Sequence, residues 1–291
     1  MKKITFFFVL CFAAGALQAR TVDVNASYTG AKHFDKVAVG ATAALSLTTL
    51  ASVEAKLANE RAFKNPIYSL AVPLALELEQ ARFVLRPFYY FKNKSDQPGL
   101  QDASAFGVNA RMRLTLSSDE VNDNYAYSFL GASFARQKGT VFYDTDPAEN
   151  RSYSQAAFSM GLSQVLYDAF GFDLEGSLFQ YPDGISGVTA LYGVMDQQEL
   201  AQTQTLDIVH ELPKYTLAAR INRIWTDNGS TAYISYRYGE YHTTKAEHSV
   251  MVGNSFTAFS RVSVDIAYNH VRDVHNNNRR DIGYVRLSTY F

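Results

Sequence analysis

The feature that most constrains the fold of this chain is an alternation of apolar and polar residues with a period of two. It is clearest between residues 104 and 116, where Phe106 and Met112 fall on one face and Asn109 and Arg111 on the other. A period of two places successive side chains on opposite faces of a β-strand, whereas a helix would mix these residues around its surface. The same alternation recurs in the segments 68–78, 155–163, 172–178, 215–222 and 262–269.

Each alternating segment is roughly ten residues long and is followed by a turn signal, a pattern typical of a membrane β-barrel. Counting the segments predicts about 14 strands, an even number that returns the chain to the side on which it began. Twelve or sixteen strands are open alternatives, because residues 51–63 also fit a helix and residues 187–194 could add a hairpin. The predicted strands are 21–30, 36–48, 51–62, 66–78, 82–93, 103–116, 124–138, 151–165, 171–181, 213–226, 230–242, 248–258, 262–273 and 281–291.

The absence of long apolar runs decides how such a chain can cross a membrane. After the first nineteen residues there is no run of the roughly 18 apolar residues that a transmembrane helix needs. Only helices and closed barrels satisfy every backbone hydrogen bond in lipid. The polar faces carry mostly Gly, Ala, Ser, Thr and Asn, which suits a confined, wet lumen. We therefore predict an all-β chain in which residues 20–291 form one transmembrane antiparallel up-and-down β-barrel.

The first nineteen residues have the layout of a cleaved secretory signal peptide. Lys2 and Lys3 form a basic region, residues 4–16 are apolar and uncharged, and Ala19 and Ala16 are the first and second candidates for the cleavage site. Cys11 is the single cysteine and lies within the apolar region, so the mature chain can form no disulfide or thiolate metal site.

Long and short connections alternate along the sequence, and barrels of this kind place long loops outside the cell and short turns in the periplasm. If Phe291 is on the periplasmic side, the long connections fall outside the cell and the short ones in the periplasm from about residue 60 onward. The longest connection is residues 182–213. It could fold inward as a constriction, cap the barrel from outside, or be an exposed loop, since long loops are often functional.

The last predicted strand ends on an aromatic residue at the final position of the chain. Residues 283–291 read Gly-Tyr-Val-Arg-Leu-Ser-Thr-Tyr-Phe. This segment resembles the C-terminal targeting signal of outer-membrane barrels, and the whole mature chain resembles a porin-like barrel at the level of its pattern. The resemblance identifies no subfamily, because autotransporter-type barrels and barrels that assist surface-lipoprotein assembly look similar. The residues that match the targeting signal are Tyr284, Leu287, Tyr290 and Phe291.

The resemblance implies a protein of the Gram-negative outer membrane, in contact with its lipid and lipopolysaccharide and inserted by the barrel-assembly machinery. It implies a porin-like channel for passive diffusion of small solutes. One alternative is a non-conducting barrel that acts through its extracellular loops or in surface protein assembly or translocation. A third hypothesis is an outer-membrane hydrolase.

Charged and amide residues on the predicted inner face are the candidates for lining a pore. They can set ion selectivity, or they can pair with one another to hold the wall together. Their mixed signs argue against a strong preference for anions or cations. The candidates are Glu77, Asn109, Arg111, Arg113, Asp173, Glu175, Arg220, Asn222, Asp265 and Arg286.

Other classes of function find little support in the sequence. Removal of Lys2 and Lys3 from a chain of formal net charge −1 leaves −3, which excludes the basic surface of a nucleic-acid-binding protein. His248 and Ser249 are adjacent, so in a strand they point to opposite faces and cannot form a catalytic pair. His242 and His248 flank one loop and could hold a divalent ion only weakly. We expect no enzyme activity, no metal site and no cofactor.

Overall fold

The computed structural model describes residues 22–32, 34–60, 66–94, 100–141, 149–184, 191–192, 208–209, 212–225, 230–242, 246–259, 261–274 and 279–290. The strands in this part of the chain form one antiparallel sheet closed on itself, which amounts to a wall of 14 strands when β4 and β5 are taken as one. The wall strands are β1 (Val22–Ala31), β2 (Phe34–Ala44), β3 (Thr49–Glu60), β4 (Ile67–Ala71), β5 (Leu74–Glu77), β6 (Ala81–Lys94), β7 (Leu100–Asp119), β8 (Asn124–Val141), β9 (Glu149–Leu166), β10 (Phe170–Gln180), β13 (Pro213–Trp225), β14 (Ser230–Tyr241), β15 (Glu247–Phe259), β16 (Val262–Asp273) and β17 (Arg279–Tyr290).

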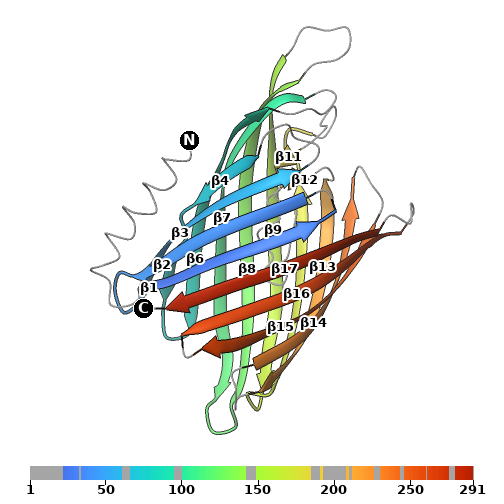
Figure 1. Ribbon diagram of the computed structural model, residues 1–291. Helices are drawn as coiled ribbons and strands as arrows, with labels where there is room; N and C mark the ends of the chain where they lie inside the picture. The colour runs from blue at the N-terminus through green and yellow to red at the C-terminus, as the bar shows by residue number, and fades with distance from the viewer. Residues whose placement is uncertain are drawn as a thin grey trace.

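The barrel closes where the first strand meets the last. β1 pairs with β2 on one side and with β17 on the other, with Val24 in register with Thr289 and Ala31 with Ile282. Figure 1 shows β1 beside β17, and shows the β7–β8 and β9–β10 turns together at the lower end of the barrel. Every wall strand therefore has two hydrogen-bonded neighbours, as a sheet in lipid requires.

One wall strand is divided in two by a proline. β4 and β5 keep the same register to β3 on both sides of the division, with Glu54 opposite Ala71 and Ala51 opposite Leu74. Pro73 lies between them and has no N–H to donate to the ladder. Its carbonyl still accepts a bond from the Ser52 N–H at 2.8 Å. The interruption is therefore local, and the predicted strand 66–78 is continuous in space.

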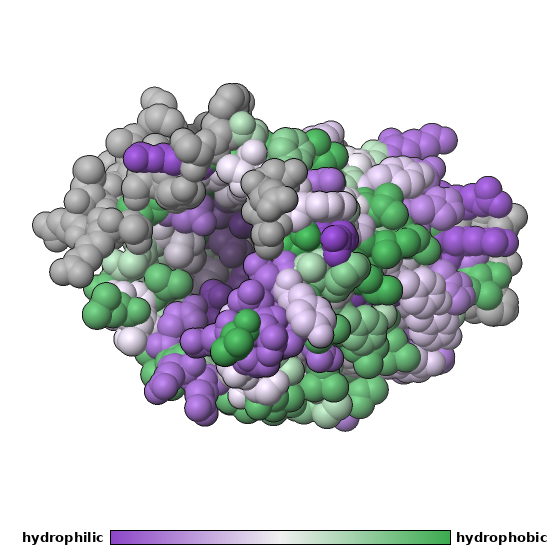
Figure 2. All heavy atoms as spheres, turned by 90° about the horizontal axis from the view of Figure 1, so that it is seen from below, coloured by the Kyte–Doolittle hydropathy of each residue, from purple (hydrophilic) through white to green (hydrophobic). Residues whose placement is uncertain are grey.

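The outer surface is hydrophobic and the inner surface is polar. Large apolar side chains such as Leu85, Phe106 and Leu174 are exposed on the outside, while their neighbours along each strand are covered. Figure 2 shows the end that carries the β7–β8 turn, with hydrophobic residues on the outer wall and a hollow bordered by hydrophilic residues. An exposed apolar surface of this extent needs lipid rather than water around it. In the part of the chain that the structure describes, no helix is long and apolar enough to span a membrane.

The closed wall confirms the predicted fold and the count of 14 strands, and the alternatives of twelve and sixteen are wrong. Residues 49–60 form β3, so the helical interpretation of 51–63 is also wrong over the described residues. The suggested hairpin at 187–194 does not join the wall. Instead β11 (Leu191–Tyr192) pairs with β12 (Ile208–Val209) in a separate two-stranded sheet.

Strand ends differ most from the predictions. β7, β8 and β9 have 20, 18 and 18 residues and are longer than predicted, because their pairing continues through polar residues past the apolar stretch. The predicted strand 36–48 ends at Ala44, where residues 45–48 turn. The predicted signal peptide (residues 1–19), most of the segment 182–213 and Phe291 lie outside the described residues, as does the side chain of Tyr290.

Candidate functional site

Two adjoining cavities lie on the inner side of β5–β8. The larger, about 640 Å³, is lined by turn residues such as Glu79 and Glu120 and lies at the end of the barrel that carries the β7–β8 turn. The smaller, about 330 Å³, lies deeper and reaches Thr42 on β2 and Ser159 on β9. Both are lined by Arg82 and Arg113, so these side chains lie where the two spaces meet.

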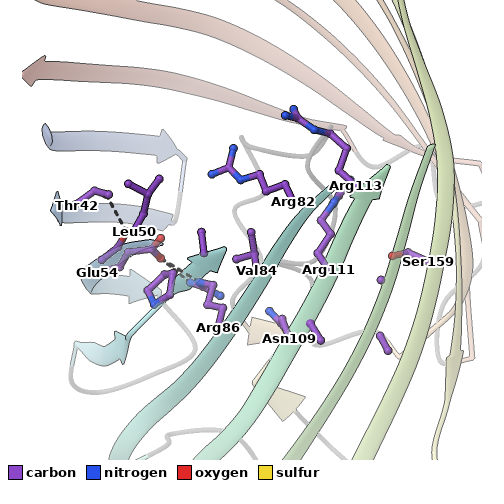
Figure 3. Close-up of a pocket in the computed structure, with 16 residues that line it drawn as sticks. Thr42, Leu50, Glu54, Arg82, Val84, Arg86, Asn109, Arg111, Arg113 and Ser159 are labelled. Atoms are coloured by element: carbon purple, nitrogen blue, oxygen red, sulfur yellow. Dashed lines mark hydrogen bonds and ion pairs between the residues drawn. The ribbon is translucent and has the colours of Figure 1, made fainter. Parts of the chain in front are cut away.

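Four arginines from two neighbouring strands point into this space. Arg82 and Arg86 come from β6, and Arg111 and Arg113 come from β7, because alternate residues of a strand share a face. Figure 3 shows Arg82, Arg111 and Arg113 extending into the same cavity. Arg82 and Arg113 are directly opposite in register, and like charges in that relation destabilise a sheet.

Two acidic residues compensate the arginines of β6. The Arg86 guanidinium donates to Glu54 Oε2 on β3 at 2.8 Å, across the strand that contains Pro73 (Figure 3). The Arg82 Nε lies 3.0 Å from Glu77 Oε1 on β5. These pairs tie β3, β5 and β6 together on the inner face of the barrel.

A different arrangement holds Arg111. Its guanidinium lies 4.3 Å from the centre of the Phe129 ring on β8 and 3.7 Å from the Glu175 carboxylate on β10. The Phe129 ring in turn covers Gly161 of β9, where any side chain would collide with it. The absence of a side chain at Gly161 therefore lets Arg111 reach across two strands to Glu175, whose exposed fraction is 0%.

Arg113 differs from the other three arginines. Its guanidinium lies 4.9 Å from the centre of the Tyr127 ring on β8. Within the described part of the chain, no carboxylate lies within ion-pair distance of it, and its side chain is exposed to the cavity. A cation stacked on an aromatic face in this way keeps its hydrogen-bond donors available for a solute.

A second polar network crosses the opposite part of the wall. Ser163 donates to Asp173 at 2.6 Å, and Asn222 donates to the other oxygen of Asp173 at 3.2 Å. Arg220 Nε donates to Asn222 Oδ1 at 2.7 Å, and its guanidinium lies 3.9 Å from the Tyr233 ring. The chain of contacts continues because the Tyr233 hydroxyl donates to Asp265 at 2.9 Å. This network links β9, β10, β13, β14 and β16.

The structure places the predicted pore-lining residues on the inner face in two groups. Glu77, Arg111, Arg113 and Glu175 belong to the arginine-rich group, and Asp173, Arg220, Asn222 and Asp265 belong to the second network. Arg286 is in register with Asp265 on one side and with Ser27 on the other; Asp23 is farther along β1, opposite Tyr290.

Asn109 lines the smaller cavity, and neither of its amide atoms has a hydrogen-bond partner among the described residues. Sequence reasoning missed Arg82, Arg86 and Glu54. The period of two through 82–93 places both arginines on the inner face and was the signal that could have found them.

A buried cluster lies at the opposite end of the barrel. Tyr153 packs with Leu212, and Tyr181 packs against both. The Tyr181 hydroxyl donates to the Pro213 carbonyl at 2.8 Å and accepts from the Gln155 amide at 3.0 Å. Burial raises the pKa of the Tyr181 phenol, so this group stays protonated at physiological pH. The two ends of the segment 182–213 are thus fixed side by side at the mouth of the barrel.

The described histidines, His242, His248 and His270, lie apart from one another, and His248 and Ser249 point to opposite surfaces as predicted. His248 contacts the Tyr236 hydroxyl on the outer surface, while Ser249 donates to Asn269 at 2.6 Å on the inner surface. His270 Nδ1 lies 2.8 Å from Asp281, a contact that the alternating pattern did not predict. No group of three or more metal-binding side chains is found among the residues that the structure describes.

A closed antiparallel wall, a hydrophobic exterior and a charged interior define the class of this protein as a transmembrane β-barrel. Solved structures with this fold include the CymD monoaromatic hydrocarbon channel, which is 9% identical with a TM-score of 0.51 over 93% of this chain and 88% of CymD. CdiB from Acinetobacter baumannii is 9% identical with a TM-score of 0.53, over 93% of this chain and 60% of CdiB. At these identities the likeness concerns the fold alone. No protein-family model and no curated protein matches the sequence.

Proposed function

We propose that this protein is a porin-like channel of the Gram-negative outer membrane that lets small hydrophilic solutes diffuse through its lumen. The observation that carries the proposal is the pair of adjoining cavities inside the wall, which meet at Arg82 and Arg113. A charged side chain buried away from water needs a partner, whereas one that stays hydrated in a water-filled lumen does not. Arg113, stacked on Tyr127 without a carboxylate partner in the described structure, favours passage.

The chemistry of the lining bears on the kind of solute. CymD, which shares the fold, is described as a channel for monoaromatic hydrocarbons. An apolar solute would need an apolar path, whereas the deeper cavity here contains the side chains of four arginines and Glu54. We therefore infer hydrophilic solutes for this chain, with charged groups lining the deeper cavity.

A second candidate function is a barrel that does not conduct and acts through its extracellular segments or in surface protein assembly. The observation in its favour is the cluster of Tyr153, Tyr181 and Leu212, which packs at the mouth where the segment 182–213 begins and finishes. CdiB shares the fold, and its structure extends well beyond the part that this chain matches. The two candidates differ in whether solutes cross the purified protein.

Liposome swelling separates these candidates. Liposomes that contain the folded protein are diluted into isotonic solutions of sugars and sugar acids of increasing size, and the rate of light-scattering change is recorded. A channel gives swelling that falls steeply with solute size. Liposomes with the same amount of heat-unfolded protein are the control. Swelling no faster than in this control would favour the second candidate.

Insertion is part of the same proposal. We infer that residues 1–19 are removed on export and that Tyr284, Leu287, Tyr290 and Phe291 are read by the barrel-assembly machinery. Support for this comes from the position of β17, which closes the wall by pairing with both β1 and β16. Deletion of Phe291 should lower the amount of folded barrel in the outer membrane, measured by heat-modifiable migration on gels; unchanged amounts would count against the inference.

A further inference from the structure

On the outer surface of β7, β8 and β9, the outward side chains change from apolar to polar along each strand. The change occurs at the same level of the barrel on all three strands. Phe106 is opposite Arg136, and Arg136 is opposite Ser154. The outward positions on the side of the β7–β8 turn are apolar, and include Phe134. The outward positions on the other side are Ser104, Lys138 and Ser152. A change of this kind marks the boundary between hydrocarbon and headgroups on a membrane barrel.

A shallow pocket of about 400 Å³ lies just beyond this boundary. Three cations line it, Lys92 from β6, Lys138 from β8 and Arg151 from β9. One carboxylate, Asp102, also lines it, together with polar groups that can bond sugar hydroxyls or phosphate oxygens, namely Ser104, Thr140, Asn150 and Ser152.

Internal pairing neutralises only part of this positive charge. Lys92 Nζ lies 3.0 Å from Asp102, and the Arg151 guanidinium lies 3.1 Å from Glu149. Arg136, next to the pocket, donates only to the Ser152 hydroxyl at 2.9 Å among the described contacts. Lys138 is exposed and has no carboxylate partner in the described part of the chain. Two cations of β8 therefore face the headgroup level with their charge uncompensated.

We propose that this outer-wall pocket binds the phosphate groups of a phosphorylated glycolipid in the outer leaflet. The acyl chains would lie against Phe106 and Phe134. Lys92 and Lys138 come from the strands on the two sides of Ser104, and the phosphates would lie between these two cations. Charge complementarity carries the proposal, because cations at the headgroup level attract anionic lipid. The inference rests on the outer-membrane location given under Proposed function and on the orientation predicted from the sequence, with the long segment 182–213 outside the cell, but not on conduction.

The test uses the purified, delipidated barrel in detergent and three lipid probes: diphosphorylated lipid A, dephosphorylated lipid A and phosphatidylglycerol. Binding is measured by native mass spectrometry over a titration. The double variant Arg136→Gln/Lys138→Gln removes the uncompensated cations, and Lys138→Gln alone serves if the double variant does not fold. Arg223→Gln/Arg261→Gln is the matched control, because both cations are exposed on strands or turns at the opposite end of the barrel.

Diphosphorylated lipid A should bind more tightly than the other two lipids. Each lost charge should weaken its binding about fivefold, so the double variant should lose about 25-fold and the control almost nothing. Equal loss in the control, or equal binding of dephosphorylated lipid A, would overturn the proposal. Equal binding of phosphatidylglycerol would replace it with a general anionic-lipid site, and displacement by millimolar inorganic phosphate would replace it with a free-anion site.

Conduction measured on the same samples keeps the two claims apart. A barrel that conducts but shows no lipid preference overturns the lipid site alone. A barrel that binds lipid A but passes no current overturns the channel and leaves the lipid site standing.

Discussion

Glycines on the inner face determine how the large lumenal side chains lie. At Gly161 an added Cβ would lie 2.2 Å from the Phe129 ring, and at Gly107 it would lie 2.4 Å from the Phe88 ring. Both rings therefore lie against the neighbouring strand, in the space that the missing side chain leaves. Contacts between an aromatic ring and a cross-strand glycine also stabilise the sheet.

Substitution of Gly161 by alanine should lower the free energy of unfolding by about 1–3 kcal/mol, because Phe129 or the backbone must shift. Urea unfolding of the refolded protein in micelles measures the change. Gly283→Ala is the matched control, because the nearest atom to its added Cβ is 4.0 Å away. Equal stability of the Gly161→Ala variant and the wild type would contradict this account of the inner wall.

The buried carboxylate of Glu175 gives a second prediction at the residue scale. Arg111→Met removes the guanidinium 3.7 Å from this fully buried group and should cost about 3 kcal/mol of unfolding free energy. The double variant Arg111→Met/Glu175→Gln should recover most of the loss, since the buried carboxylate charge is then removed as well. Urea unfolding tests both, and a double variant as unstable as Arg111→Met would show that the charge pairing is unimportant.

Residue positions on a strand face were predictable, but their partners were not. The alternation correctly placed Arg111 and Glu175 on the inner face, yet they meet only because β8 and β9 between them have Phe129 and Gly161 at matching register. Glu54 was obscured because the segment 51–63 also fits a helical period. Its partner Arg86 lies two strands away, and a local pattern contains no information on that distance.

At the scale of elements, the barrel has regular hydrogen bonding along its wall and side-chain contacts that fix the connections. Tyr181 is the clearest example, because its hydroxyl joins the end of β10 to the start of β13 and to Gln155 of β9. Tyr181→Phe leaves the Pro213 carbonyl and the Gln155 amide without this partner, which should cost about 1–2 kcal/mol.

Because Tyr181 lies at the mouth and not in the wall, its loss should loosen the connection while the barrel stays folded. Limited proteolysis should cut the Tyr181→Phe variant between residues 182 and 212 faster than the wild type. The heat-modifiable migration of the two proteins should be the same. Tyr167→Phe is the control, since Tyr167 is exposed in the turn at the other end. Unchanged cleavage would show that this hydroxyl does not fix the segment.

Element ends were less predictable than elements. The apolar faces of β7, β8 and β9 predicted the part of each strand that faces the hydrocarbon. The strands continue beyond that part through polar residues such as Arg136 and Lys138. Backbone pairing outside the bilayer needs no apolar alternation, so the sequence pattern stops before the strand does. Pro73 shows the reverse case, in which a residue typical of a strand end lies within a continuous wall.

At the scale of the whole molecule, closure into a ring explains why the strand count could be inferred. Each strand needs two neighbours, so fourteen alternating segments can form few closed sheets. The sequence contains no comparable rule for the width of the lumen. That width depends on how side chains such as Arg82 and Arg113 lie. The cavities that they share can be seen only in three dimensions.

Ion selectivity should respond to Arg113, which faces both cavities without a carboxylate partner in the described structure. Arg113→Glu should shift the reversal potential in a salt gradient toward cation selectivity, because it exchanges a positive for a negative charge at the junction. Arg223→Glu, on the outer surface, should leave the reversal potential unchanged. Equal reversal potentials in all three proteins would place the ion path away from Arg113.

The most direct test of the central claim is the single-channel current of the purified, folded barrel in a planar lipid bilayer. The account predicts discrete, stepwise increases in current as barrels insert, with step sizes that fall when polymers large enough to fill the lumen are added. A folded, inserted protein that gives no current steps would contradict the claim that the charged interior of this wall is an open, water-filled path.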